Sequence, residues 1–468
     1  MNDTRKSQAN ASGMSVTSLD AYMQRSFEQW EQQAAVPGSV QEPAKVGRPR
    51  RLPGVVLWTT MLRGVLLHVK GVQDLWRALV LQGYDISDQT VYDRLESEGT
   101  APLEQIFAQF THVLAAWLTP LVSQQSWWKE LAPFASDILA LDETTLDPVA
   151  RILPQLRRVQ KGAVELLPGK LAGLFDVRLQ LWRRVDYLPE ALQNCKVHAR
   201  TMLSGVAHGT LLLFDLGYFG FEWLDELTDG HYWYISRLRE KTSSAILHTF
   251  YQAEGVFDGL VWLGTGRARA AHAVRLVRWQ VGVLQVTYVT NVLEPEKLSL
   301  QDIARLYGRR WDIELAFLTL KESLGLHLWW SSKVTCVLQQ VWACLIIAQF
   351  LQAMRLEIAC RAGVDPFEVS LPLLISTLPS VQATGSDPIS VYVQRGRQLG
   401  LIRPSSRTHF QAPLIAASAR TPLPDDLILH RTAAYPVSPG QPGRHSHKKK
   451  AGRVPIRLTA DLYAFLQQ

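Results

Sequence analysis

The sequence has few cysteines, and none lies in a pattern that builds a cross-link or a zinc site. Only four occur among the 468 residues, Cys195, Cys336, Cys344 and Cys360, and no two of them form a CxxC pair. A disulfide framework and a structural zinc site are therefore not expected. This usage favours a reduced compartment, so we expect a cytoplasmic protein.

A secretion signal and an uninterrupted hydrophobic run are also missing. The first thirty residues contain no apolar signal core, which argues against secretion. The most apolar stretch, 336–354, is interrupted by four glutamines. This pattern predicts a buried helix rather than a membrane span, so we expect no membrane partner.

What the chain does have is a modest excess of positive charge. It carries 49 Lys plus Arg against 42 Asp plus Glu, a formal net charge of +7, with a pI of about 9.2. Such an excess favours a polyanionic partner, although it is far from histone-like. The basic segment 45–51, KVGRPRR, is either a solvated linker or an arm that lies on DNA phosphates.

The most informative stretch is 307–321, YGRRWDIELAFLTLK. Read as a helix, it places Tyr307, Arg310, Glu314 and Lys321 on one stripe about 60° wide. Apolar residues border the stripe on both sides, Trp311, Leu315 and Leu318 on one and Ile313, Phe317, Leu320 and Leu324 on the other. The opposite face is predicted to be wet and carries Arg309, Asp312, Thr319 and Ser323.

Burying these polar groups costs several kcal/mol unless they find partners. One interpretation is a structural ion network in which Arg310 and Lys321 pair with Glu314. The other is a site in which the carboxylate holds a metal ion and the basic residues hold phosphates. A simple solvated face is a third reading, and the apolar borders argue against it.

The spacing Tyr-x2-Arg-x3-Glu-x6-Lys resembles the signature of the bacterial DDE transposases of the insertion-sequence-4 type, and all four positions match. The resemblance implies that Glu314 is the third of three catalytic carboxylates and that two aspartates lie upstream at strand ends. It also implies double-stranded DNA as the partner, both transposon terminal repeats and target DNA, and a homodimer on that DNA.

Two aspartates fit the expected places. Asp142 follows the short apolar run 138–141, and Asp137 is a competing candidate that precedes the run. Asp215 follows the apolar run 210–214 and begins Asp-x-Gly-Tyr, which resembles the family's second signature. Two departures are Glu143, where a small residue is usual, and Leu216, where a basic residue is common. An aspartate that only caps a turn is the alternative at Asp142.

Three carboxylates that converge can hold two Mg²⁺ ions, because hard divalent cations prefer carboxylate oxygens. Mn²⁺ is expected to substitute. We expect Asp142, Asp215 and Glu314 to be both catalytic residues and metal ligands. Tyr307, Arg310 and Lys321 are expected to contact DNA phosphates.

The order of elements predicts an α/β fold with a ribonuclease H-like catalytic core and an inserted β-rich domain. A helical N-terminal domain precedes the core and C-terminal helices follow it. The insertion, about 231–290, is basic, and in the resembled family such an insertion covers the DNA end. Trp262 and Trp279 are candidates for stacking a flipped base, with core packing as the alternative for each.

Four regions are predicted along the chain. They are a flexible basic N-terminal arm (1–51), a helical DNA-binding domain (52–131), the catalytic domain (132–354), and C-terminal helices with a basic tail (355–468). In the second region, helices at 72–82 and 89–96 resemble a helix-turn-helix, although a plain bundle explains them as well.

The predicted function is a DNA transposase that performs metal-dependent cleavage at transposon ends and strand transfer into target DNA, which is cut-and-paste transposition. It is expected to act in the cytoplasm, on the nucleoid. The alternative is a catalytically silent DNA-binding regulator derived from a transposase. The presence of all three carboxylates favours the enzyme.

Overall fold

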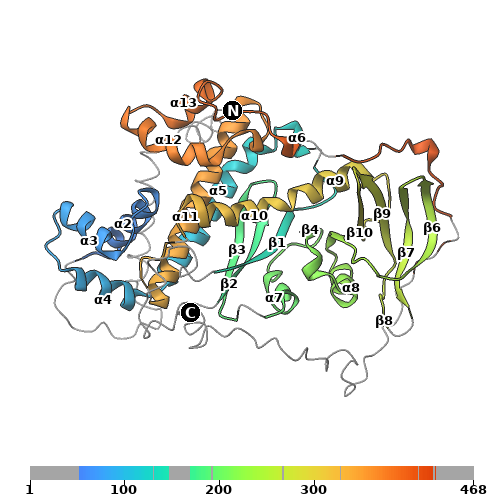
Figure 1. Ribbon diagram of the computed structural model, residues 1–468, viewed down its shortest axis with the longest axis horizontal. Coiled ribbons are helices and arrows are strands. Elements are labelled where there is room, and N and C mark those ends of the chain that lie inside the picture. Colours follow the sequence, from blue (N-terminus) through green and yellow to red (C-terminus); the bar gives the residue numbers. More distant parts are fainter. Residues whose placement is uncertain are drawn as a thin grey trace, which may run out of the picture.

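The computed structural model shows a helical region on one side and a long, extended sheet on the other (Figure 1). It describes residues 52–129, 131–146, 169–190, 193–265, 268–326, 328–331, 333–408, 411–424, 427 and 429. The predicted basic arm and the basic tail lie outside the described residues.

The N-terminal region is helical, as predicted. It contains α2 (Gly54–Leu66), α3 (Val72–Leu81), α4 (Asp88–Glu98), α5 (Ala101–Val122) and the short α6 (Ser126–Lys129). Helix α4 begins where the Ser87 side chain accepts a hydrogen bond from the backbone N–H of Thr90. The helices agree with the sequence predictions to within a few residues, because each has a clear apolar stripe and a turn residue at its end.

The pair α3 and α4 has the order of a helix-turn-helix, but the charge of α4 does not suit a DNA groove. This helix carries four carboxylates and one arginine, Asp88, Asp93, Glu96, Glu98 and Arg94. Arg94 pairs with Glu98 and donates to the backbone oxygen of Leu52. A recognition helix needs positive charge near phosphates, so the plain bundle is the better description of this region.

A single sheet forms the centre of the chain. Its strand order is β3-β2-β1-β4-β5-β10-β9-β7-β6, with β8 paired to β7. Strands β1, β4 and β5 are mutually parallel, and the other pairs are antiparallel. The strands are β1 (Ile138–Thr145), β2 (Lys170–Asp176), β3 (Leu181–Leu188), β4 (Leu211–Phe214), β5 (Trp233–Arg237), β6 (Ser244–Ala253), β7 (Val256–Thr265), β8 (Ala268–Arg269), β9 (Val274–Val281) and β10 (Leu284–Thr290).

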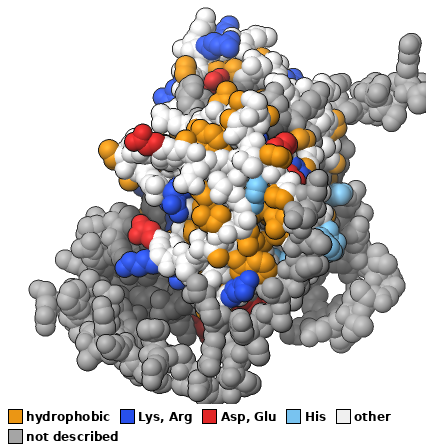
Figure 2. All heavy atoms as spheres, turned by 90° about the vertical axis from the view of Figure 1, so that its right-hand side faces the viewer, with side chains coloured by type: hydrophobic (Ala, Val, Ile, Leu, Met, Phe, Trp, Pro, Cys, Tyr) orange, Lys and Arg blue, Asp and Glu red, His pale blue; other side chains and the backbone are white. Residues whose placement is uncertain are grey.

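The β-rich segment extends this sheet instead of forming a sheet of its own. Strand β5, which falls inside the predicted insertion, pairs in parallel with β4. Strand β10 returns beside β5, with Tyr288 opposite Arg237. The outer strands β6, β7 and β9 therefore continue the hydrogen-bonded ladder away from the helices, and Figure 2 faces that outer end, where apolar and basic side chains are interspersed.

Helices cover both faces of the inner sheet (Figure 1). Helices α7 (Cys195–Met202) and α8 (Phe221–Asp229) pack on one face. Helices α9 (Leu300–Arg309) and α10 (Trp311–Leu318) pack on the other face together with α5 and α11 (Val334–Ala362). Helix α7 is shorter than the predicted 189–205, because it starts only after the capping side chain of Asn194.

Helix α11 is long and apolar enough to cross a membrane by length and composition, but 78% of its apolar window is buried inside the protein. Three of its glutamines, Gln339, Gln340 and Gln349, form hydrogen bonds there. The amide of Gln349 accepts from the N–H of Trp182 and donates to its carbonyl and to the hydroxyl of Thr111. The helix is thus the central core helix of the bundle, as the interrupted apolar run predicted.

The C-terminal part of the chain contacts both the helical region and the outer strands of the sheet. After η5 (Pro366–Glu368), helices α12 (Leu371–Ala383) and α13 (Pro388–Arg395) pack on α11. The short turns η6 (Ser406–Thr408) and η7 (Ala417–Ala419) follow. The segment 411–421 then reaches the outer sheet, where the N–H of Thr421 donates to the carbonyl of Phe250.

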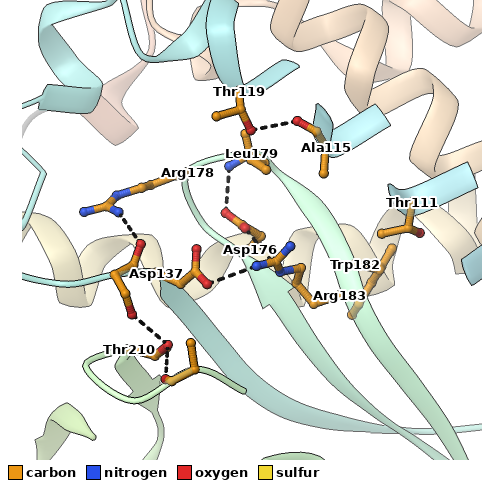
Figure 3. A network of polar contacts seen from close by, with 12 residues as sticks. Thr111, Ala115, Thr119, Asp137, Asp176, Arg178, Leu179, Trp182, Arg183 and Thr210 are labelled. Atoms are coloured by element: carbon orange, nitrogen blue, oxygen red, sulfur yellow. Dashed lines mark hydrogen bonds and ion pairs between the residues drawn. The ribbon is translucent and has the colours of Figure 1, made fainter. Parts of the chain in front are cut away.

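The linker into β1 is held by one buried arginine, Arg178, at the β2–β3 turn (Figure 3). Its guanidinium donates to the backbone oxygens of Leu131 (2.9 Å), Ala132 (2.7 Å), Ala135 (3.2 Å) and Ser136 (3.1 Å). These four bonds fix the point at which the chain enters the strand that carries Asp142.

Asp137 lies at the amino end of β1 in a structural ion network (Figure 3). Its carboxylate is 3.0 Å from the guanidinium of Arg183, which also lies 3.6 Å from Asp176. Burial raises the pKa of Asp176 to about 6, and Arg183 opposes that shift. Asp137 therefore has a local partner at the opposite end of β1 from Asp142.

We predict that Arg178→Met lowers the free energy of unfolding by about 3 kcal/mol, because it leaves four carbonyl groups without their charged donor. Urea unfolding of the full chain measures this change. Arg63→Met, at an exposed position of α2, is the matched control and should change stability by no more than about 0.5 kcal/mol. Equal stability of the two variants would contradict the linker role of Arg178.

Candidate functional site

The two aspartates lie on neighbouring parallel strands. Asp215 directly follows β4, whereas Asp142 lies inside β1, because the run predicted to end at residue 141 continues as a strand to Thr145. In the β1–β4 ladder Leu141 lies opposite Phe214, so the next step places Asp142 beside Asp215. Parallel strands end at a common edge, which is where sites form in open α/β sheets. The Asp215 side chain also accepts from the N–H of Gly217 at 2.8 Å, which fixes the turn after β4.

Glu314 reaches the same edge from α10, which packs on β1 and β2. The guanidinium of Arg310 lies 2.7 Å from Glu314 and 3.8 Å from Asp142. It is 6% exposed, and no described group accepts a hydrogen bond from its Nε or Nη1 atom in suitable geometry. The structure thus brings Asp142, Asp215 and Glu314 together, with an arginine between two of them.

The electrostatics of Asp142 reflect this crowding. Burial raises the pKa of its carboxyl to about 7. The N–H of Glu143, which donates to Asp142 at 2.8 Å, opposes the shift. The charges of Asp215 and Glu314 raise the pKa further, whereas Arg310 lowers it. Carboxylates that share a site raise one another's pKa when a neighbouring cation offsets only part of their repulsion.

The donor set suits a hard divalent cation, because it consists of carboxylate oxygens that repel one another. As the side chains stand, no group of three His, Cys, Asp or Glu in the described part of the chain is placed to hold a metal ion. The positive charge at the cluster comes instead from Arg310. Carboxylate oxygens are suitable ligands for Mg²⁺. In this structure, however, the Arg310 guanidinium lies between the carboxylates of Asp142 and Glu314.

The predicted helix 307–321 is three pieces rather than one. Helix α9 begins at Leu300 with a capping box of Ser299 and Asp302, and it ends at Arg309. Arg310 then joins α9 to α10, and the last turn, η4 (Thr319–Ser323), is a π-helix. Such π-turns are frequent at functional sites. The uniform 100° spacing used for the prediction therefore fails at both ends of the stretch.

One apolar border of the stripe was predicted correctly. Ile313, Phe317, Leu320 and Leu324 are all buried. The other border is wrong, because Trp311, Leu315 and Leu318 are 52%, 37% and 44% exposed.

The predicted wet face is also wrong at two positions, Arg309 and Asp312, which are both buried. Arg309 pairs with Asp365 at 2.7 Å, and Asp312 accepts from Arg407 and Gln180, each at 2.8 Å. Asp365 and Arg407 come from the C-terminal part of the chain, and Gln180 comes from the β2–β3 turn. Local periodicity carries no signal for partners that lie 56 to 132 residues away in the sequence.

Tyr307 is buried and points into the protein. Its hydroxyl lies 3.4 Å from the carbonyl oxygen of Phe214, the last residue of β4, and its ring packs 4.7 Å from that of Tyr288. Burial raises the pKa of Tyr307 to about 12. The residue therefore ties α9 to the end of the strand that precedes Asp215.

Lysines hold the end of β1 on both faces. Lys321 donates to the Thr144 hydroxyl at 2.7 Å and to the Thr145 carbonyl at 3.0 Å. On the other side, the buried Lys170 lies 2.5 Å from Glu143. The charge of Glu143, which stands where the resembled family usually has a small residue, is thus balanced by Lys170. Nothing in the sequence indicated this pair, because the two residues meet only through the pairing of β1 with β2.

The two tryptophans proposed for base stacking are both in the core. Trp279 is 1% exposed, packs on Tyr288 and donates from its indole N–H to the carbonyl of Gln411. Trp262 is 7% exposed and donates to Ala270, with the guanidinium of Arg269 over its ring. In this conformation, core packing is the role that the structure gives them.

Trp311 is the aromatic residue that the sequence analysis missed. It lies directly after Arg310, whose guanidinium is 5.2 Å from its ring, and three residues before Glu314. The signal was present in the sequence, but an aromatic side chain at helical spacing was read as part of the core.

Residues 185–350 match the family model described as a transposase DDE domain. The match covers about a third of the chain and includes Asp215 and Glu314, whereas Asp142 lies outside it. No curated protein matches the chain. Among solved structures, the chain is similar to a piggyBac transposase in a cryo-EM synaptic complex with hairpin DNA. That similarity has 10% identity and a TM-score of 0.37 over 80% of this chain and 81% of the other, which is too weak to support an argument.

We predict that Asp142→Asn stabilises the protein at alkaline pH. The folded pKa of about 7 lies above the unfolded value of about 3.9, so ionisation of Asp142 costs stability as pH rises between them. The gain should be near zero at pH 3 and reach at most about 4 kcal/mol above pH 7.

Urea unfolding across this pH range, with a chelator present, measures the gain. Asp137→Asn is the control, because Asp137 is paired with Arg183, and it should show no such gain. A native protein as stable as Asp142→Asn at pH 8 would contradict the electrostatic description of the cluster.

Proposed function

We propose that this protein is a DNA transposase of the DDE type that cleaves DNA at transposon ends and joins those ends to target DNA by cut-and-paste transposition. The observation that carries the proposal is the convergence of Asp142, Asp215 and Glu314 at one sheet edge. Two of these carboxylates lie within the segment that matches the transposase DDE domain. The insertion-sequence-4 type remains the subgroup that the motif spacing favours.

The topology supports a ribonuclease H-like core. The inner strands have the order β3-β2-β1-β4-β5, with β1, β4 and β5 parallel and an antiparallel hairpin on the outside. This arrangement puts two carboxylates on neighbouring central strands and lets a later helix deliver the third. The strands from β6 to β10 are the insertion between β5 and that helix.

In this proposal Asp142, Asp215 and Glu314 hold two Mg²⁺ ions, and Mn²⁺ can replace them. When bound, the ions supply an activated water or 3′-hydroxyl and stabilisation of the leaving oxygen. Arg310 balances the carboxylates in the absence of the ions. Once the ions take over that role, its guanidinium is free to make a bidentate contact with a phosphate beside the reacting bond.

The partner is double-stranded DNA, both the terminal repeats and the target. Exposed Trp311, beside Arg310, takes over the base-stacking role that was first assigned to Trp262 and Trp279. We propose a homodimer on the DNA, because two transposon ends have to be held together for joining. The protein acts on the nucleoid, in the cytoplasm.

We predict that Asp142→Asn, Asp215→Asn and Glu314→Gln each reduce Mg²⁺-dependent nicking of transposon-end DNA by about 10³-fold or more, since a lost metal ligand removes several kcal/mol of transition-state stabilisation. DNA affinity should stay within a few-fold of native. Gel analysis of a duplex that carries the element's own ends measures both quantities.

Asp137→Asn serves as the matched control and should retain nicking, because Asp137 lies at the other end of β1. Full cleavage by any one of the three cluster variants would refute its assignment. A native protein that binds the ends and never nicks them would instead identify a silent DNA-binding regulator.

We also predict that Lys321→Ala weakens DNA-end binding and lowers the slope of log K against log salt concentration by about 1, the value for one phosphate contact. Filter binding across a salt series measures the slope. An unchanged slope together with reduced thermal stability would show that Lys321 serves only to hold Thr144 and Thr145.

A further inference from the structure

A cationic notch lies beside the carboxylate edge, between α7, the start of α8, the loop after β5 and the β7–β8 turn. Its volume is about 400 Å³, and its lining includes Lys196, Phe219, Gly220, Arg239 and Lys241. Three of these residues are basic and none is acidic. None of the three was assigned a role by the motifs that identify the carboxylate cluster.

The notch concentrates positive charge without an internal counter-ion. Lys196 donates to the carbonyl of Phe219 at 2.9 Å, which holds its ammonium beside Gly220. A Cβ atom at Gly220 would lie 3.2 Å from that nitrogen, so the glycine leaves room for it. Gly220 is also the N-cap of α8 and provides no side-chain cap.

The positive end of the α8 dipole therefore adds to the charge of the lysine. Glu222, in the first turn of α8, is 84% exposed at its side chain and lies 3.7 Å from Arg200. It is not among the residues that line the notch. Cations gathered in a concave site repel one another until an anion binds between them.

The position of the notch defines which anion it would take. Phe219 and Gly220 follow Asp215 by four and five residues, through the single turn of η3 (Leu216–Tyr218). Lys196 lies on α7, which packs against η3 directly after Asp215, so the notch and the carboxylate cluster share one stretch of backbone. Each DNA strand carries a phosphate about every 3.4 Å along its axis, so a strand that enters the cluster also presents phosphates beside it.

We propose that this notch binds a backbone phosphate of the DNA strand that enters the carboxylate cluster, with Lys196 and Arg239 as the contacting residues. The inference rests on the proposed function, because it takes the polyanion at this edge to be DNA. It adds a second cationic anchor besides Arg310. Two anchors at different places fix the direction of the strand as well as its position.

The test compares Lys196→Gln/Arg239→Gln with the control Arg395→Gln/Arg397→Gln, which removes the same charge from exposed positions at the end of α13. The probe is a labelled duplex that carries the element's ends. In the notch variant, we expect the slope of log K against log salt to fall by about 1 to 2, whereas the control keeps the native slope.

A second probe locates the contact. A neutral methylphosphonate, moved one phosphate at a time along the strand that carries the cleaved bond, should weaken binding by the native protein at a position beside that bond. It should have no further effect on the notch variant, since the same contact is already lost. Urea unfolding of both variants confirms that they fold.

The outcomes separate the two proposals. A notch variant with the native salt slope and the native response to methylphosphonate overturns the notch and leaves the transposase proposal in place. A native protein that neither binds nor nicks the duplex overturns the transposase proposal itself. If millimolar inorganic phosphate raises the melting temperature of the native protein but not of the notch variant, while DNA binding is equal, the notch takes a free anion and the DNA assignment is overturned.

Discussion

The central constraint on this structure is the electrostatic repulsion among three carboxylates that lie at one edge of a sheet. Asp142 and Asp215 are neighbours because β1 and β4 are parallel and Leu141 lies opposite Phe214. Glu314 joins them, and repulsion and burial raise the pKa of Asp142 to about 7. Arg310 lies between Asp142 and Glu314 and offsets part of this cost. If cations bind such a cluster, their binding free energy is coupled to the free energy of folding.

Several contacts exist to keep that edge in place. Arg178 fixes the entry of β1 through four backbone oxygens, and Lys321 holds its exit through Thr144 and Thr145. Tyr307 reaches the end of β4 at the carbonyl of Phe214. These groups act through the backbone next to the carboxylates, so they set the positions of the acidic side chains without touching any reacting atom. Tyr307 and Lys321 therefore contact backbone groups, whereas Arg310 and Glu314 of the same motif contact each other.

Charge is distributed unevenly around the same edge. Helix α4, the candidate recognition helix, is acidic, whereas the notch beside α8 is basic and has no carboxylate in its lining. Trp311 adds an exposed aromatic ring next to Arg310. Positive charge is therefore present at the cluster itself, in Arg310, and in the notch. The sheet edge itself, more than the N-terminal bundle, is the surface with the chemistry for a nucleic acid backbone.

The sequence by itself determined the local elements and the identity of the cluster. Apolar runs that end in aspartate predicted β1 and β4, and motif spacing singled out Arg310 and Glu314, because these features depend on neighbours a few residues apart. Tertiary structure decided which faces are buried. Arg309 and Asp312 are inside because Asp365 and Arg407 meet them there, whereas Trp311 is 52% exposed beside the Arg310 guanidinium. Periodicity records that a helix has two faces, but only contacts between distant segments decide which face is covered.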